Sequence, residues 1–141
     1  MNGPILSIIT VNFNNNFGLL TTLESVSWQS FSSYEHIIID AGSTDGSRET
    51  IIQYEKENPH LSFWSSEPDK GIYDGMNKGI DHAKGQYLYF LNSGDCLSQD
   101  ILAKIPFDGT EYLYGDTILF YKRKTKKRVY PDTLDLIYLS D

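Results

Sequence analysis

Residues 35–47 read Glu35-His-Ile-Ile-Ile-Asp-Ala-Gly-Ser-Thr-Asp-Gly-Ser47, and this stretch decides the fold class. Its first part, Glu35 to Ile39, is the short β-branched run typical of a parallel strand that is covered on both faces. The turn residues from Asp40 to Ser47 end that strand and lead into a predicted helix that runs to about Glu57. A strand, a turn and a helix in this order form the repeating unit of α/β proteins.

The same order recurs on both sides of this stretch. Upstream, Ile5 to Val11 predicts a strand, and apolar residues at helical spacing predict a helix to about Gln29. Downstream, Leu61 to Ser65 and Tyr87 to Leu91 predict two strands, with a helix from Ile72 to near Gly85 between them. Strands and helices that alternate in this way predict an open, mostly parallel sheet with flanking helices.

The C-terminal part predicts a different arrangement. A brief helix is expected from Gln99 to Lys104, and strands are expected at 111–121 and 129–131. These two strands would form a C-terminal β-hairpin around the basic run Lys122 to Arg128. No repeat or linker marks a boundary, so residues 1–141 are expected to form one domain.

Composition excludes several classes of protein. The chain has 141 residues, of which 40% are hydrophobic and 22% charged, and this mixture indicates a folded domain and not a disordered tail. No run approaches the roughly 20 apolar residues of a membrane helix, and no secretory signal is evident. The single cysteine, Cys96, excludes an internal disulfide and a cysteine-rich zinc site, and we expect it to be a small buried residue. A cytoplasmic location is therefore expected, with any metal held by oxygen or histidine.

Charge is distributed unevenly along the chain. The net charge of −7 argues against nucleic acid as a partner, because nucleic-acid binding needs a basic surface. Six of the 12 basic residues nevertheless lie between Lys122 and Arg128. The simplest interpretation of this run is a solvated hairpin tip. The alternative is a peripheral contact with anionic lipid headgroups at the inner face of the membrane.

Polar clusters follow each of the four predicted parallel strands. Because ligands of such sheets bind beyond the carboxyl ends of the strands, these clusters are expected to face one crevice. They are Thr10 to Asn12, Asp40 to Asp45, Glu67 to Gly71 and Asn92 to Asp95.

The crevice is expected to be acidic. A diphosphate would be repelled there unless a divalent cation accompanied it, and oxygen ligands favour Mg²⁺ or Mn²⁺. Asp95 is the first candidate ligand because it follows a buried strand directly, in a Ser-Gly-Asp turn. The alternative for Asp40, Asp45 and Asp95 is a purely structural role in turns and helix caps. The asparagines at 14–16 are better explained as turn and capping residues than as ligands.

Four segments in order resemble the donor-binding half of family 2 glycosyltransferases over about residues 5 to 116. They are Thr10-Val-Asn12, the turn 40–47, Asp69-Lys-Gly-Ile-Tyr-Asp-Gly-Met-Asn-Lys-Gly79 and Phe90-Leu-Asn-Ser-Gly-Asp95. The resemblance is strongest to bacterial members that build surface polysaccharides. It implies a GT-A-like fold with a Rossmann-like open sheet, and inverting transfer of a sugar from a nucleoside diphosphate donor to a polysaccharide or lipid-linked acceptor, usually with Mg²⁺ or Mn²⁺.

The resemblance also implies roles for particular residues. Asp40 would hydrogen-bond the nucleobase, and Asp95 would be the metal-binding carboxylate. The other donor-binding residues would be Thr10, Val11 and Asn12 along the nucleoside, and Lys70, Asp74, Asn77 and Ser93 around the rest of the donor.

This chain departs from the family pattern in three ways. Many relatives have Leu-Asp-Ser-Asp-Asp where this chain has Leu91-Asn-Ser-Gly-Asp95, so one carboxylate of that cluster remains. Met76 stands where many relatives have arginine, and Lys70 is hypothesised to supply the missing charge. Relatives also continue for a hundred residues or more beyond the position of Asp141, so we expect this chain to be a fragment without the acceptor-binding half.

No catalytic base is assigned, because the resemblance places it beyond Asp141; Asp116 is an alternative inside the chain. An exposed sheet edge would favour a homodimer. A second hypothesis is a non-catalytic nucleotide-sugar-binding module that recruits a partner through the basic hairpin.

Overall fold

A computed structural model describes residues 3–107, 117–121 and 124–128. Its elements are β1 (Leu6–Asn12), α1 (Asn16–Ser27), β2 (Tyr34–Asp40), α2 (Ser47–Glu57), β3 (Leu61–Ser66), α3 (Ile72–His82), β4 (Tyr87–Phe90), the short 3-10 helix η1 (Ile101–Lys104), β5 (Thr117–Tyr121) and β6 (Lys124–Arg128). The chain divides into two compact units, Met1–Pro106 and Phe107–Asp141.

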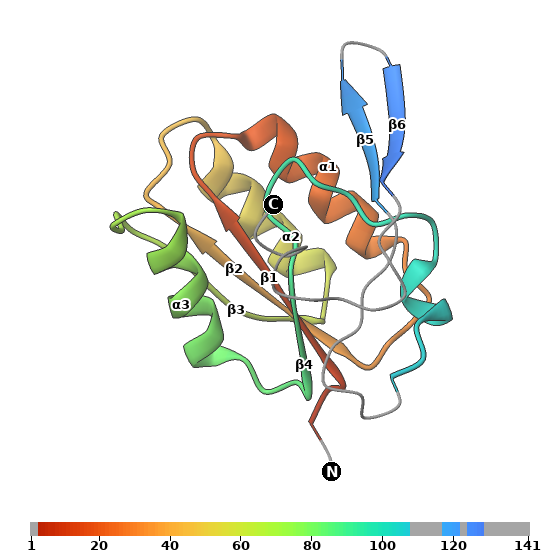
Figure 1. Ribbon diagram of the computed structural model, residues 1–141. Coiled ribbons are helices and arrows are strands. Elements are labelled where there is room, and N and C mark those ends of the chain that lie inside the picture. The colour runs from red at the N-terminus through yellow and green to blue at the C-terminus, as the bar shows by residue number, and fades with distance from the viewer. Residues whose placement is uncertain (1–2, 108–116, 122–123, 129–141) are drawn as a thin grey trace. The chain divides into compact units, whose positions relative to one another are not determined.

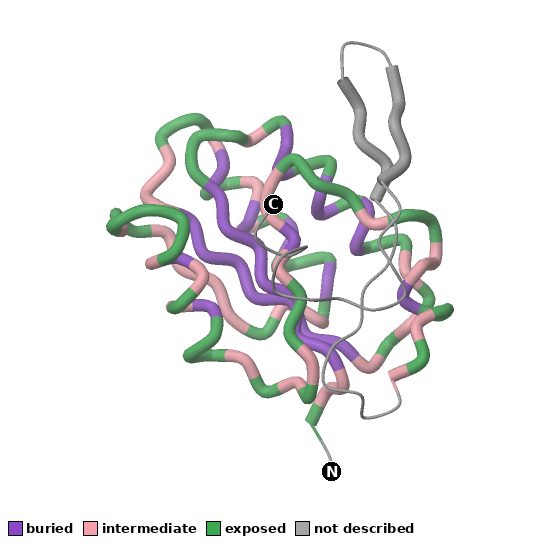
Figure 2. Tube along the Cα trace, viewed as in Figure 1, coloured by how far each residue is buried: buried purple, intermediate pink, exposed green. Residues whose placement is uncertain are grey.

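Four parallel strands form the sheet of the first unit, in the order β3-β2-β1-β4 (Figure 1). The predicted open parallel sheet is therefore confirmed, and each predicted strand in it agrees with the structure to within one residue at either end. The two central strands, β1 and β2, are buried along their whole length (Figure 2). This explains the apolar run Ile37 to Ile39, and the polar residues of the two strands, among them Thr10 and Asp40, are buried with hydrogen-bond partners.

Helices cover both faces of this sheet. On one face Leu19 and Leu23 of α1 pack with Ile38 of β2 and with Ile51 and Tyr54 of α2. On the other face α3 packs over the two central strands (Figure 1). Its approach is so close that a Cβ added at Gly79 would lie 2.4 Å from Ile9 Cγ2. The glycine therefore allows α3 to lie close to the sheet.

The second unit contains β5 and β6, which pair antiparallel. The boundary predicted from the sequence was wrong here, because Lys124–Arg128 forms a strand and is not part of the turn. A strand rich in basic residues can form when the neighbouring strand supplies the backbone hydrogen bonds. The predicted strand at 129–131 lies outside the described residues, as does Asp116.

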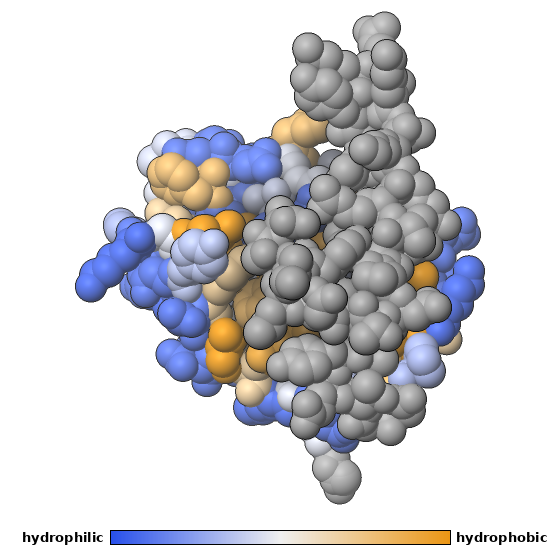
Figure 3. Space-filling view, in the orientation of Figure 1, coloured by the Kyte–Doolittle hydropathy of each residue, from blue (hydrophilic) through white to orange (hydrophobic). Residues whose placement is uncertain are grey.

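The visible surface of the described part is mostly hydrophilic, with smaller hydrophobic areas between the charged ones (Figure 3). Several large apolar side chains are nevertheless exposed, Phe17 by 84% and Tyr73 by 78%. Among the described residues, the helices are all too short or too polar to cross a membrane.

Candidate functional site

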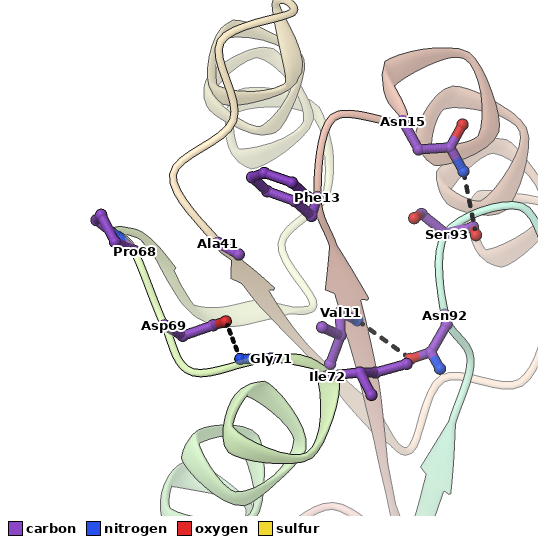
Figure 4. Close-up of a pocket in the computed structure, with 10 residues that line it drawn as sticks. All are labelled: Val11, Phe13, Asn15, Ala41, Pro68, Asp69, Gly71, Ile72, Asn92 and Ser93. Atoms are coloured by element: carbon purple, nitrogen blue, oxygen red, sulfur yellow. Dashed lines mark hydrogen bonds between the residues drawn. The ribbon is translucent and has the colours of Figure 1, made fainter.

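A cavity of about 540 Å³ lies at the carboxyl ends of the parallel strands (Figure 4). All four loops that follow these strands contribute to its lining, so the predicted convergence on one crevice is confirmed. The lining residues are Val11, Phe13, Asn15, Ala41, Pro68, Asp69, Gly71, Ile72, Asn92 and Ser93. They include one carboxylate, Asp69, and no lysine or arginine.

Asp40, the last residue of β2, is the centre of a buried hydrogen-bond network beside this cavity. One carboxylate oxygen accepts from Asn12 Nδ2 at 2.8 Å and from the Ser43 hydroxyl at 2.6 Å. The other accepts from the Ser43 amide at 2.9 Å and from the Ser66 hydroxyl at 2.7 Å. Burial raises the pKa of Asp40, but these hydrogen bonds lower it by more, so its pKa lies below the ordinary value. Asp40 thus organises the loop, and its contact with a nucleobase stays a prediction.

The loop after β2 is fastened to the loop after β1. Asn14 Oδ1 accepts from the Thr44 amide at 2.8 Å, and Asp45 Oδ2 accepts from the Asn16 amide at 2.8 Å. Hydrogen bonds from Ser47 and Asn16 lower the pKa of Asp45. Asn15 caps α1 by accepting from the Gly18 amide at 3.2 Å. Asn15 is therefore a capping residue, as predicted, and it also lines the cavity, whereas the side chains of Asn14 and Asn16 accept hydrogen bonds from Thr44 and Thr50.

Thr10 and Val11 point to opposite faces of β1, as neighbours in a strand do. Val11 lines the cavity. The buried Thr10 hydroxyl instead lies 2.8 Å from His36 Nε2, and His36 Nδ1 lies 2.8 Å from the Tyr54 hydroxyl. Burial lowers the pKa of His36 to about 3, so the ring is neutral at pH 7. This places the Thr10 side chain in the core and gives His36 a structural role that the sequence did not indicate.

In the segment 69–77, the predicted donor-binding residues do not line the cavity, but the residues next to them do. Asp69 and Gly71 line it, whereas Lys70 between them is exposed. Asp74 accepts from the Lys70 amide at 2.9 Å and lies 3.8 Å from Lys78 Nζ. Asp74 thus ties the first turn of α3 to the residue before its N-cap. Asn77 is exposed on the same helix and does not line the cavity.

Asp95 lies on the turn that follows β4. The Asp95 amide donates to Asn92 O at 3.0 Å, and Gly94 has a φ of 101°, as in a type II turn that needs glycine at its third position. Asp95 is exposed, and Ser93 on the same turn lines the cavity. Within the described part of the chain no group of three His, Cys, Asp or Glu side chains could hold a metal ion.

Cys96, the next residue, is exposed, so the expectation of a buried cysteine was wrong. The turn that carries it lies on the surface. Partial burial of the thiol and the nearby Asp95 and Glu24 carboxylates raise the pKa of Cys96. A raised pKa disfavours the thiolate, so the side chain is no better suited to act as a nucleophile.

Phe13 is the main cavity residue that sequence reasoning missed, whereas Asp69 belongs to the Glu67 to Gly71 cluster that was expected to face the crevice. Phe13 is 61% exposed and its ring lies beside the cavity, on the same side as Ala41 (Figure 4). Its sequence signal was an aromatic residue inside a polar turn, where burial cannot account for it. Asp69 accepts from the Gly71 amide at 2.9 Å, while its other oxygen is buried without a partner among the described residues.

Comparison with known proteins identifies the family of the chain. A model of the family described as "Glycosyl transferase family 2" matches residues 7–130. The chain belongs to this family. The expectation drawn from the four segments is therefore confirmed at the level of the family.

Two relatives illustrate this membership of glycosyl transferase family 2. An uncharacterized glycosyltransferase of Mycobacterium tuberculosis is 43% identical over 103 residues, which cover 72% of this chain and 38% of that protein. The putative teichuronic acid biosynthesis glycosyltransferase TuaG of Bacillus subtilis is 37% identical over 101 residues, covering 72% and 40%. This chain spans less than half the length of these curated relatives.

The fold is also that of solved glycosyltransferases. The structure of a mannosyltransferase from Pyrobaculum calidifontis, in complex with GDP-Man and Mn²⁺, superposes with a TM-score of 0.65 at 20% identity. The match covers 72% of this chain and 31% of the mannosyltransferase. The GT-A-like α/β fold is thus confirmed for the four-stranded sheet and its helices.

Proposed function

We propose that this family 2 chain binds a nucleoside diphosphate sugar and supplies the donor side of an inverting sugar transfer to a saccharide or lipid-linked saccharide acceptor. The cavity lined by all four loops at the carboxyl ends of the strands carries this proposal. It has the exposed ring of Phe13 at one side, and at another side the turn after β4, where Ser93 lines the cavity and the neighbouring Asp95 is exposed without lining it. These features match the two parts of such a donor, a flat base and a charged diphosphate.

The base is proposed to stack on Phe13. Aromatic rings offer a face to every base, and Val11, Ala41 and Pro68 give the same part of the cavity an apolar lining. Asn12 and Asp40 hold the two loops that form this part and do not line it themselves. Lys70 is proposed to meet the diphosphate, because its side chain is exposed between two cavity residues.

The oxygen ligands that the protein offers here fit a divalent cation that is shared with the substrate. Mg²⁺ and Mn²⁺ commonly keep several waters and use one or two protein carboxylates together with substrate phosphates. Asp95 is exposed, and within the described residues its carboxylate makes no hydrogen bond or ion pair, so it is free to act as that ligand. A bound cation would neutralise the charge that develops on the leaving diphosphate. The residues around it would orient the donor and leave the anomeric carbon open to the acceptor hydroxyl.

The location of the reaction is also a proposal. We place it in the cytoplasm at the inner face of the membrane, with the basic run Lys122 to Arg128 near anionic headgroups. Six basic residues within seven positions support this placement.

Asp95→Ala is expected to remove the metal-dependent part of nucleotide binding. Titration calorimetry with GDP, UDP, ADP and CDP should show one preferred base, bound at least about ten-fold more tightly with Mn²⁺ than with EDTA. The variant should bind that nucleotide with the same affinity in both conditions. The control, Asp81→Ala, removes an exposed carboxylate of α3 and should keep the full effect of Mn²⁺.

Absence of binding to every nucleotide would contradict the proposed function. Hydrolysis of the matching nucleotide sugar to free sugar would favour an enzyme, and binding without any hydrolysis or transfer would favour a non-catalytic module.

Phe13→Ala is expected to weaken nucleotide binding by about 1–3 kcal/mol, since this is the usual effect of removing an aromatic stacking partner. The loss should be equal with Mn²⁺ and with EDTA, because the ring contacts the base and not the phosphates. Phe17→Ala is a matched control, since Phe17 is exposed on α1 and does not line the cavity. Equal affinities for the two variants would show that the base does not stack on Phe13.

A further inference from the structure

Polar side chains along one side of α1 hold the backbone of the segment after β4. Asn15 and Gln29 do this at the two ends of the helix: Asn15 Nδ2 donates to Ser93 O at 3.3 Å, and Gln29 Nε2 donates to Ser98 O at 2.9 Å. Ser25 Oγ accepts from the Leu97 amide at 3.0 Å. Residues 15, 22, 25 and 29 recur at intervals that keep them on one side of a helix.

Thr22 makes the most central of these contacts. Its side chain is fully buried, yet it bonds only backbone groups. The hydroxyl accepts from the Gly94 amide at 3.0 Å, and of the carbonyls within reach of its single proton Asp95 O is nearest at 2.7 Å, with Gly18 O at 3.0 Å. A hydroxyl has one proton and two lone pairs, so this geometry uses it as donor and acceptor towards two consecutive residues.

The turn held by Thr22 is also held at Ser93, whose carbonyl accepts from Asn15 Nδ2 and whose amide donates to Val11 O. Asp95 is exposed, and Gly94 adopts a positive φ that only glycine tolerates easily. Within the described residues, the Asp95 side chain has no hydrogen bond that would fix its position. The place of the carboxylate therefore depends on its backbone, and Thr22 holds that backbone on both sides of the Asp95 amide.

We infer that Thr22 is a positioning residue that sets where the Asp95 carboxylate meets the metal-bound diphosphate. This inference rests on the proposed function. Groups that orient a metal ligand without touching the metal typically change metal affinity by 10–100-fold when they are removed. Thr22 acts in this way through its hydroxyl and not through the bulk of its side chain.

The test compares Thr22→Val, which removes the hydroxyl at similar volume, with Thr22→Ser, which keeps it. Thr21→Val is the matched control, because Thr21 is the exposed neighbour and its hydroxyl bonds only Phe17 O. The readouts are the affinity for the preferred nucleoside diphosphate with Mn²⁺ and with EDTA, and the hydrogen exchange of the Gly94 amide in the protein without ligand.

In Thr22→Val, the increase in nucleotide affinity that Mn²⁺ causes should be about ten-fold or more smaller than in the wild type. The affinity measured in EDTA should be unchanged. The Gly94 amide of this variant should exchange faster, whereas Thr22→Ser and Thr21→Val should match the wild type in both readouts. An unchanged gain from Mn²⁺ in Thr22→Val would overturn the inference.

Two outcomes separate the inference from its premise. A wild-type chain that binds no nucleotide contradicts the proposed function, whatever the exchange data show. A Gly94 amide that exchanges as fast as an unstructured peptide in the wild type contradicts the positioning role, and this measurement needs no variant to fold.

Discussion

Replacing Asp40 by alanine is expected to lower the free energy of unfolding by about 3–5 kcal/mol, the upper range for a single substitution. The variant leaves the buried Asn12 amide, the Ser43 amide and hydroxyl, and the Ser66 hydroxyl without their acceptor in a largely buried site. Denaturant unfolding followed by tryptophan fluorescence at pH 7 measures the change.

Asp81→Ala serves as the control for this experiment, since an exposed substitution on α3 should change the unfolding free energy by less than about 0.5 kcal/mol. A loss in Asp40→Ala no larger than in this control would show that the network does not stabilise the fold. The lowered pKa of Asp40 adds a second expectation. The stability that the ionised Asp40 carboxylate contributes should be complete above the ordinary pKa of aspartate. It should be lost as the pH falls through the lower pKa of Asp40 in the folded state.

The second large effect is a loss of stability in acid caused by His36. Its pKa is about 3 in the folded protein and 6.5 in an unfolded chain. Below pH 6.5 the unfolded chain therefore takes up a proton that the folded chain refuses, and stability falls as the pH drops towards 3. At 1.36 kcal/mol per pH unit, the neutral His36 ring lowers the unfolding free energy by up to about 5 kcal/mol between pH 6.5 and pH 3.

The decisive measurement is the unfolding free energy between pH 6.5 and pH 5, above the range in which carboxylates titrate. His36→Gln cannot take up this proton. Its unfolding free energy should therefore change less over that range than that of the wild type, although the variant should be less stable at pH 7. His82→Gln keeps His36 and should therefore retain a steeper fall in unfolding free energy over this range than His36→Gln. Equal slopes for the wild type and His36→Gln would contradict the assignment.

The sequence predicted the order of the elements because local patterns determine them. The β-branched runs of β1 and β2 are long enough to indicate strands, and glycine and polar residues mark the turns after them. Parallel strands place their carboxyl ends at one edge, so the convergence of four loops followed from element order alone. The motif resemblance added the family, which the comparisons confirmed.

The sequence did not predict which polar side chains face the cavity. Both faces of β1 and β2 are covered by helices, so a continuous apolar run does not show to which side each residue points. Thr10 and Val11 were therefore grouped together, although one bonds His36 in the core and the other lines the cavity. Phe13 was overlooked because its exposure depends on the path of the turn.

The sequence by itself determined an α/β chain of family 2, with acidic and amide residues gathered at one edge of a parallel sheet. Only the tertiary structure decided their roles, because these depend on contacts between residues far apart in the chain. The register of β1 and β2 sets Asn12 opposite Asp40, which makes them a buried pair. The packing of α1 against the turn after β4 brings the Thr22 hydroxyl to the backbone of Asp95. Neither contact leaves a local pattern, since each is created by strands and helices that meet only in the folded protein.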